Sequence, residues 1–157
     1  MMASWLFCLL LTAPFLLAAA EERKAIVILQ SDVGVLGNVT FIQFEDNGPV
    51  TVTGTISGLS KGKHGFHVHD KGDLSTGCMS MAGHFNPDMK NHGGPNDKER
   101  HAGDLGNISA DKNGVAIIMI TDSIISLTAG KYNILGRGLV VHSDVDDLGR
   151  GGFSDSL

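Results

Sequence analysis

The segment VTVTGTIS, Val50–Ser57, carries the clearest secondary-structure signal in the chain. Apolar residues alternate in it with threonine and serine, so polarity changes at nearly every step. Residues two apart on a β-strand point to the same face of the sheet, and this period of two therefore predicts a strand with one buried face. Its β-branched residues also favour extended backbone.

Similar runs lie on both sides of this segment. They are KAIVILQ (Lys24–Gln30), NVTFIQF (Asn38–Phe44), GFHVH (Gly65–His69), VAIIMIT (Val115–Thr121) and GRGLVVH (Gly136–His142). Glycine, asparagine, aspartate and lysine turn signals divide the runs, and no stretch of helical period reaches a useful length. We therefore predict an all-β, immunoglobulin-like fold, arranged as a Greek-key β-sandwich or barrel.

Composition and charge indicate a single globular domain. The chain has 157 residues, of which 42% are hydrophobic and 18% charged, a balance that supports a hydrophobic core and argues against disorder. The formal net charge is -5, and the sequence contains no basic run. We therefore expect no nucleic-acid partner and no binding to an anionic membrane surface.

Residues 1–20 differ in character from the rest of the chain. They form a short apolar run that ends in Ala18, Ala19 and Ala20, and charged residues begin at Glu21. An apolar run closed by small residues is typical of a cleaved signal peptide. A membrane anchor is the alternative, but the run is short and Pro14 interrupts it. We predict a signal peptide at 1–20, a secreted domain at 21–157, and no membrane attachment after cleavage.

A secretory route has consequences for cysteine and asparagine. Cys8 would leave with the signal peptide, so we expect Cys78 to be unpaired or to pair between chains. The sequons NVT at Asn38 and NIS at Asn107 are compatible with N-glycosylation where they are exposed.

Histidines gather around one of the predicted strands. In KHGFHVHD, Lys63–Asp70, the side chains of His67 and His69 would point to one strand face and Val68 to the other. A lone histidine here would be interpreted as a satisfied core residue. Three in this short segment, out of seven in the chain, favour a metal site instead.

The segment between Lys71 and His101 is rich in glycine, aspartate, asparagine and proline, and we predict that it is a long loop, which is either functional or disordered. This loop and the last predicted strand supply more metal-ligand residue types, namely His84, His92, His101, Asp104 and His142. Imidazole suits copper and zinc, and three histidines with one carboxylate form a set suited to zinc. The HExxH motif, the nucleophile elbow and the phosphate-binding loop are all missing from the sequence.

Four segments resemble the copper/zinc superoxide dismutases in order and spacing. They are GFHVHD, GCMSMAGHFNP, HGGPNDKERHAGDLGN and GRGLVVHSDVDDLGRGG. The resemblance covers most of the chain from Lys24 to Leu157. It implies an enzyme that converts superoxide to dioxygen and hydrogen peroxide by redox cycling of copper, with copper and zinc as cofactors.

The resemblance also implies a role for each matching residue. Copper would be held by His67, His69, His84 and His142, and zinc by His84, His92, His101 and Asp104. His84 belongs to both sets, and the resemblance implies a bridging imidazolate that takes part in proton transfer. His64 matches a position that supports the copper ligands by hydrogen bonding, and Asp146 matches an aspartate that links copper-side and zinc-side histidines.

The chain departs from the family after GRGGFSDSL, where the family continues through an active-site loop and a final strand. That continuation carries an arginine beside copper and the cysteine partner of the position matched by Cys78. We therefore expect a domain that is incomplete at its C-terminus, with the last strand missing. The alternatives are a truncated metal scavenger of weak activity and an inactive subunit that works through a partner. A homodimer is a further partner that the resemblance allows.

Overall fold

The computed structural model describes residues 22–151. Its strands are β1 (Arg23–Gln30), β2 (Leu36–Gln43), β3 (Val50–Ser57), β4 (Gly62–His69), β5 (Ser75–Cys78), β6 (Asp104–Ala110), β7 (Ala116–Asp122) and β8 (Gly138–Val141), and a 3-10 turn, η1, spans Met79–Met81. Within residues 22–151 there is no α-helix, and accordingly no helix long and apolar enough to cross a membrane. The predicted signal peptide at 1–20 lies outside the described residues. So do residues 152–157, which directly precede the point where the chain was expected to depart from the family.

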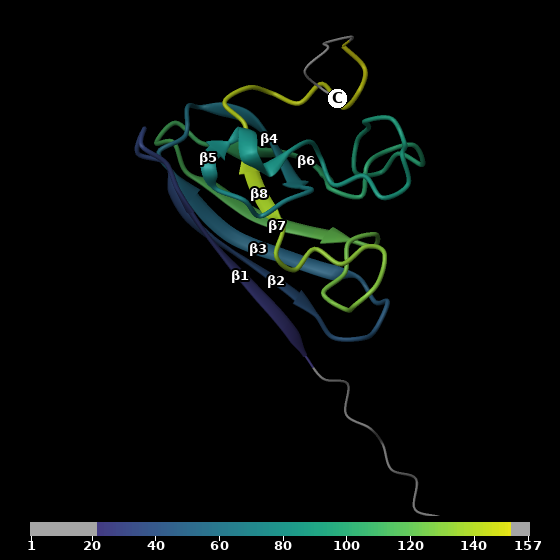
Figure 1. The fold of residues 1–157 in the computed structure, drawn as a ribbon. Coiled ribbons are helices and arrows are strands. Elements are labelled where there is room, and N and C mark those ends of the chain that lie inside the picture. The colour runs from purple at the N-terminus through teal and green to yellow at the C-terminus, as the bar shows by residue number, and fades with distance from the viewer. Residues whose placement is uncertain (1–21, 152–157) are drawn as a thin grey trace, which may run out of the picture.

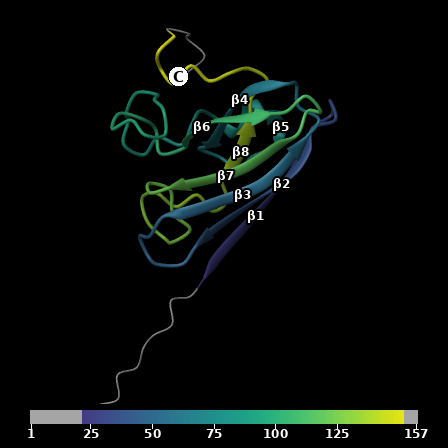
Figure 2. The same cartoon turned by 180° about the vertical axis from the view of Figure 1, so that it is seen from behind.

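Seven of the strands form one antiparallel sheet in the order β1-β2-β3-β7-β6-β4-β8. The long strands β1, β2, β3 and β7 lie side by side, and the sheet then curls so that β6, β4 and β8 face them (Figures 1 and 2). The crossings between β3 and β7 and between β4 and β8 make the order non-sequential, as in a Greek key. The predicted all-β, Greek-key class is confirmed.

The core forms from the inward faces of these strands. On β3, Val50, Val52 and Ile56 are buried, as the alternation of this segment predicts. Val52 pairs with Phe41 of β2 on one side and with Ile120 of β7 on the other. Apolar side chains on one face of a sheet are what a closed or sandwiched β fold buries.

All six predicted strands are present, with ends that differ by up to three residues. Two strands were missed. The short β5 interrupts the long loop, and β6 begins at Asp104, which we expected within that loop. β6 lacks a clean period of two because the register shifts between Gly65 and His67 of the partner strand β4. Gly106 supplies the extra residue of this bulge at φ +82°.

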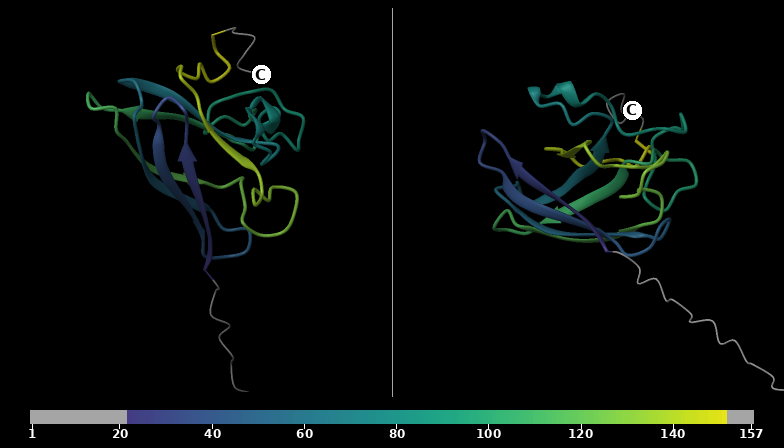
Figure 3. Two further views of the ribbon diagram at one scale, coloured as in Figure 1. Left: turned by 60° about the vertical axis from the view of Figure 1, so that its left-hand side comes forward. Right: turned by 60° about the horizontal axis from the view of Figure 1, so that its bottom comes forward.

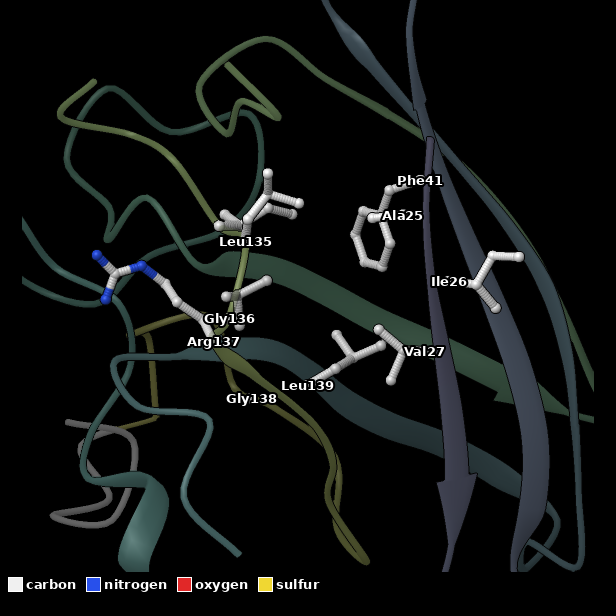
Figure 4. Close-up of a pocket in the computed structure, with 11 residues that line it drawn as sticks. Ala25, Ile26, Val27, Phe41, Leu135, Gly136, Arg137, Gly138 and Leu139 are labelled. Atoms are coloured by element: carbon white, nitrogen blue, oxygen red, sulfur yellow. The ribbon is translucent and has the colours of Figure 1, made fainter. Parts of the chain in front are cut away.

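An apolar cavity of about 370 Å³ lies between the edge strands β1 and β8. Ala25 and Val27 of β1 line one side, and Leu139 of β8 with Leu135 and Gly136 lines the other (Figure 4). No histidine lines this cavity, so it is separate from the histidine cluster described next.

Candidate metal centre

Strand β4 supplies two histidines from one face. The side chains of His67 and His69 are buried, and so are those of Phe66 and Val68 on the opposite face, which join the hydrophobic core. Because both faces of β4 are buried, its burial does not alternate along the strand as it does in β3. The histidine face is covered by the long loop and by the segment after β8, which lie together at one end of the sheet (Figure 3).

His142 reaches the same place from the end of β8. Because β8 runs antiparallel to β4, with Val141 opposite Phe66, the next residue faces Gly65 and donates its amide to the Gly65 carbonyl at 2.8 Å. A Cβ atom on Gly65 would lie 3.0 Å from Cε1 of His67 and 3.4 Å from Cδ2 of His142. The missing side chain at Gly65 therefore leaves room for both rings.

The long loop returns beside β4 and brings His84 into the cluster. The Phe85 amide donates to the Val68 carbonyl at 2.9 Å, and His84 forms an isolated β-bridge with His69. The ring centroids of His84 and His67 lie 4.0 Å apart.

Asp104 contacts the three histidines of the loop, His84, His92 and His101. It is fully buried, and Oδ1 accepts from Nδ1 of His84 at 2.9 Å and of His101 at 3.2 Å. Oδ2 accepts the His101 amide at 2.8 Å and lies 3.0 Å from Nδ1 of His92. The angle of that last contact is not that of a hydrogen bond, so Nδ1 of His92 is an ion-pair neighbour of Asp104.

These side chains form two sets that share one member. The first is His67, His69, His84 and His142, and the second is His84, His92, His101 and Asp104. Within each set, one nitrogen or oxygen per residue lies within 4.8 Å of the others. The structure thus brings together the two groups of residues for which the family resemblance implies copper and zinc, with His84 in both.

Three ring nitrogens of the first set have no hydrogen-bond partner. They are Nδ1 of His67, Nε2 of His69 and Nε2 of His142, all buried. The other nitrogens of His67 and His69 are held by Asp146 and by the Ala82 carbonyl, at 2.8 and 2.7 Å. Buried polar atoms normally have partners, and converging free imidazole nitrogens are the donor set that copper or zinc takes. The residues therefore fit a bound metal.

The surroundings shift the pKa values of the clustered histidines in opposite directions. Burial lowers the pKa of His67 and His69, and burial with the nearby histidines lowers that of His142 to about 4. Burial also acts to lower the pKa of His92, but its contacts with Asp104 and Asp146 outweigh burial and raise that pKa to about 9. His67, His69 and His142 are therefore neutral at pH 7, as histidine ligands to a metal must be.

Asp146 joins the two sets from the segment after β8. Its Oδ2 accepts from Nε2 of His67 at 2.8 Å and its Oδ1 accepts from Nε2 of His92 at 2.7 Å. Burial on its own would raise the pKa of Asp146, but these histidine contacts hold it well below its usual range. A charged carboxylate between the rings fixes which nitrogen of each ring is free.

The remaining predicted residues lie around the cluster. His64 is buried outside both sets, with Nδ1 2.8 Å from the His142 carbonyl and Nε2 2.8 Å from the Ser60 carbonyl. Cys78 is exposed at the end of β5 and forms no disulfide within residues 22–151. Asn38 is exposed on β2, whereas Asn107 on β6 is half-buried.

Two residues that sequence analysis missed also shape the site. Gly65 leaves room for the rings, as described above. Arg100 is buried, donates from Nη1 to the Asp104 carbonyl at 2.6 Å, and pairs through Nη2 with Asp122. The only sequence signal for Arg100 is its place next to His101, which did not distinguish it from a solvated loop charge.

Comparisons with known proteins agree with this geometry. A family model described as copper/zinc superoxide dismutase matches residues 35–156. "Superoxide dismutase [Cu-Zn] 5" from Dictyostelium discoideum is 53% identical over 133 residues, which cover 85% of this chain and 86% of that protein. The crystal structure of the clock protein EA4 matches with a TM-score of 0.79 and 49% identity, over 85% of this chain and 83% of that one.

Proposed function

The chain belongs to the copper/zinc superoxide dismutase family, and from this membership we propose which of its side chains bind the metals and carry the reaction. It is an oxidoreductase with copper and zinc as cofactors. In the reaction, two superoxide ions and two protons give one dioxygen and one hydrogen peroxide. We assign copper to His67, His69, His84 and His142, and zinc to His84, His92, His101 and Asp104.

The observation that carries this assignment is the set of buried, unpartnered nitrogens on His67, His69 and His142. These three residues and His84 each offer one ring nitrogen that lies within 4.8 Å of the others, which is close enough for all four to bind one metal ion. Copper, when bound, supplies one-electron redox chemistry, whereas zinc has none. The chain itself presents His67, His69 and His142 to the first metal as neutral imidazoles, and it adds the carboxylate of Asp104 to the second set.

We assign proton transfer to His84. Its Nδ1 is directed at Asp104, 2.9 Å away, and Nε2 lies on the opposite side of the ring, toward the rest of the first set. A ring placed between the two sets can hold a proton at Nε2 and give it to the substrate as peroxide forms. Asp146 and His64 orient the surrounding ligands through His67, His92 and the main chain of His142.

The test is dismutation by the purified chain from Glu21 to Leu157, with copper and zinc content measured on the same sample. We expect both metals at one per chain and turnover that is lost in His142→Ala. Stoichiometric metal without turnover would instead favour a metal-binding scavenger or an inactive partner subunit. Failure to bind either metal would overturn the assignment.

We further propose that residues 1–20 direct the chain into the secretory route and that 21–157 is the working domain. The apolar run closed by Ala18–Ala20 supports this, because signal peptidase accepts such a pattern. N-terminal sequencing of protein collected from the medium should begin at Glu21. Retention in cells with residues 1–20 still attached would contradict the proposal. Dimerisation stays a prediction, and sedimentation of the same sample tests it.

A further inference from the structure

The side chain of Asn107 holds the main chain of Asp146 at two points. Its Nδ2 donates to the Asp146 carbonyl at 2.9 Å, and its Oδ1 accepts from the Asp146 amide at 2.8 Å. Both bonds join one planar amide to one residue, so together they set the position and the direction of the Asp146 backbone. A single hydrogen bond would leave that backbone free to rotate.

Asp146 depends on such a support because it lies in a segment without regular secondary structure. It must still aim one carboxylate oxygen at Nε2 of His67 and the other at Nε2 of His92. Asn107 lies on β6, where it pairs with Gly65 of β4. The support therefore comes from the same two strands that carry His67 and Asp104.

We propose that Asn107 is a positioning residue for both metal sets and that, for this reason, it does not carry an N-linked sugar although it begins a sequon. The proposal rests on the proposed function, since it takes the two sets to be metal sites. Asn107, Ile108 and Ser109 form the sequon NIS, and the sugar would attach to Nδ2, the atom that donates to Asp146.

The geometry of the amide makes the sugar and the contact with Asp146 exclusive. Both bonds reach the same residue, so the hydrogen that Nδ2 donates is the one on the Oδ1 side of the amide. A substituted amide strongly prefers the trans form, which places the new substituent on that same side. A sugar on Asn107 would therefore replace the hydrogen that binds Asp146. Asn38 is exposed on β2 and carries no such constraint from burial.

The first experiment locates the sugars. The full chain is secreted from a eukaryotic host with copper and zinc in the medium. Each sequon peptide is then analysed by mass spectrometry after enzymatic deglycosylation in oxygen-18 water, which marks every asparagine that carried a sugar. We expect a sugar on Asn38 and none on Asn107 in the metal-loaded fraction. Ser109→Ala destroys the second sequon but keeps Asn107, and it should leave the mass pattern unchanged. A sugar on Asn107 in metal-loaded protein would overturn the proposal.

The second experiment measures positioning in protein made in bacterial cytosol, so it does not depend on secretion. Zinc affinity is measured by competition with a chromophoric chelator, and the site geometry is monitored by the visible and electron paramagnetic resonance spectra of added copper(II). We expect Asn107→Ala to weaken zinc binding about tenfold to a hundredfold and to shift the copper spectrum. Asn107→Asp keeps the acceptor but loses the donor, and it should change both readouts in the same direction. Ser109→Ala should match the wild type.

Asp146→Asn calibrates the second experiment and should move both readouts further than Asn107→Ala does. Unchanged zinc affinity and copper spectrum in both Asn107 variants would leave Asn107 a structural residue only and overturn the proposal, while the proposed function would stand. Unchanged readouts in Asp146→Asn would overturn the role of Asp146 itself, and the role of Asn107 with it.

Discussion

At the scale of single residues, His92 differs from the other histidines of the cluster. Its pKa is raised to about 9, because contacts with Asp104 and Asp146 outweigh the opposing effect of burial. In metal-free protein its ring is therefore charged below about pH 9 and stabilises the fold there. That contribution is complete below its ordinary pKa of 6.5 and is lost as the pH rises through 9.

Zinc must displace the extra proton of His92 when it binds. We predict that zinc uptake at pH 7.5 to 8 releases about one proton from this ring, so that zinc affinity falls as the pH is lowered. Calorimetry in two buffers of different ionisation enthalpy measures the number released. Copper added to zinc-free protein provides the comparison, because the lowered pKa values of His67, His69 and His142 mean that these rings release no proton. Zinc binding without proton release would contradict the prediction.

The family resemblance named the proposed ligand residues and two supports, His64 and Asp146, from the sequence, but it did not name Gly65, Arg100 or Asn107 as supports. Two histidines at a spacing of two on a strand must share a face. Gly65 gives no such sign, because the absence of a side chain matters only once His142 has been brought opposite it by β8. Asn107 was read only as the start of a sequon, since its contact with Asp146 spans 39 positions of sequence.

At the scale of secondary-structure elements, β4 must carry two rings and also let β8 approach. Gly65→Ala would place a methyl group 3.0 Å from Cε1 of His67 and 3.3 Å from Cβ of Asp146. We expect this overpacking to lower the free energy of unfolding by about 1–3 kcal/mol and to weaken copper binding. Urea unfolding and copper competition measure the two effects. Gly83→Ala is the control, because no atom lies within 4 Å of its added Cβ; equal behaviour of the two variants would refute the explanation.

Arg100 connects the long loop that carries His84, His92 and His101 to strands β6 and β7 of the sheet. Its guanidinium is buried, holds the Asp104 carbonyl and pairs with Asp122, whose other oxygen accepts the amides of Ile124 and Ile125. Arg100→Met leaves Asp122 buried and unpaired, which typically costs about 3–5 kcal/mol of stability. We expect the free energy of unfolding, measured by urea denaturation, to fall by about 3–5 kcal/mol and zinc binding to weaken.

The comparison for Arg100 is Arg150→Met. Arg150 forms two bonds to Asp97, at 2.8 and 2.9 Å, but its side chain is 59% exposed. Exposed ion pairs contribute about 0–1 kcal/mol, so this variant should unfold close to the wild type. A loss at Arg150 as large as that at Arg100 would show that burial does not set the difference.

The strands with one buried face were predictable and β6 was not. β3 alternates throughout, so its pattern identifies it. In β6 the apolar residues Leu105 and Ile108 are three apart, because the bulge at Gly106 changes the face between them. This bulge depends on the pairing of β6 with β4, which joins distant parts of the chain. The local sequence pattern of β6 contains no information about that pairing.

At the scale of the whole molecule, the hydrophobic core and the metal centre are separate. The core lies between the faces of the sheet, whereas the ligands come mainly from β4, the long loop and the start of the segment after β8. Strand number and spacing predicted the Greek-key class but not the order of the strands in the sheet. Which loop covers β4 depends on contacts such as Phe85 with Val68 and Arg150 with Asp97, which join residues far apart in sequence.

This separation predicts what metal removal does. Chelation of both metals leaves buried imidazole nitrogens without partners and removes stabilisation of about 4 kcal/mol for each metal held at a thousand times its dissociation constant. We expect the melting temperature to fall by at least about 10 °C. Because the core does not contain the ligands, amide hydrogen exchange should accelerate in residues 82–103 and 142–150, while β2, β3 and β7 stay protected. Uniform acceleration of exchange across the sheet would show instead that the core and the metal centre unfold as one unit. In that case, adding zinc back alone should restore protection throughout the sheet as well as in the loop.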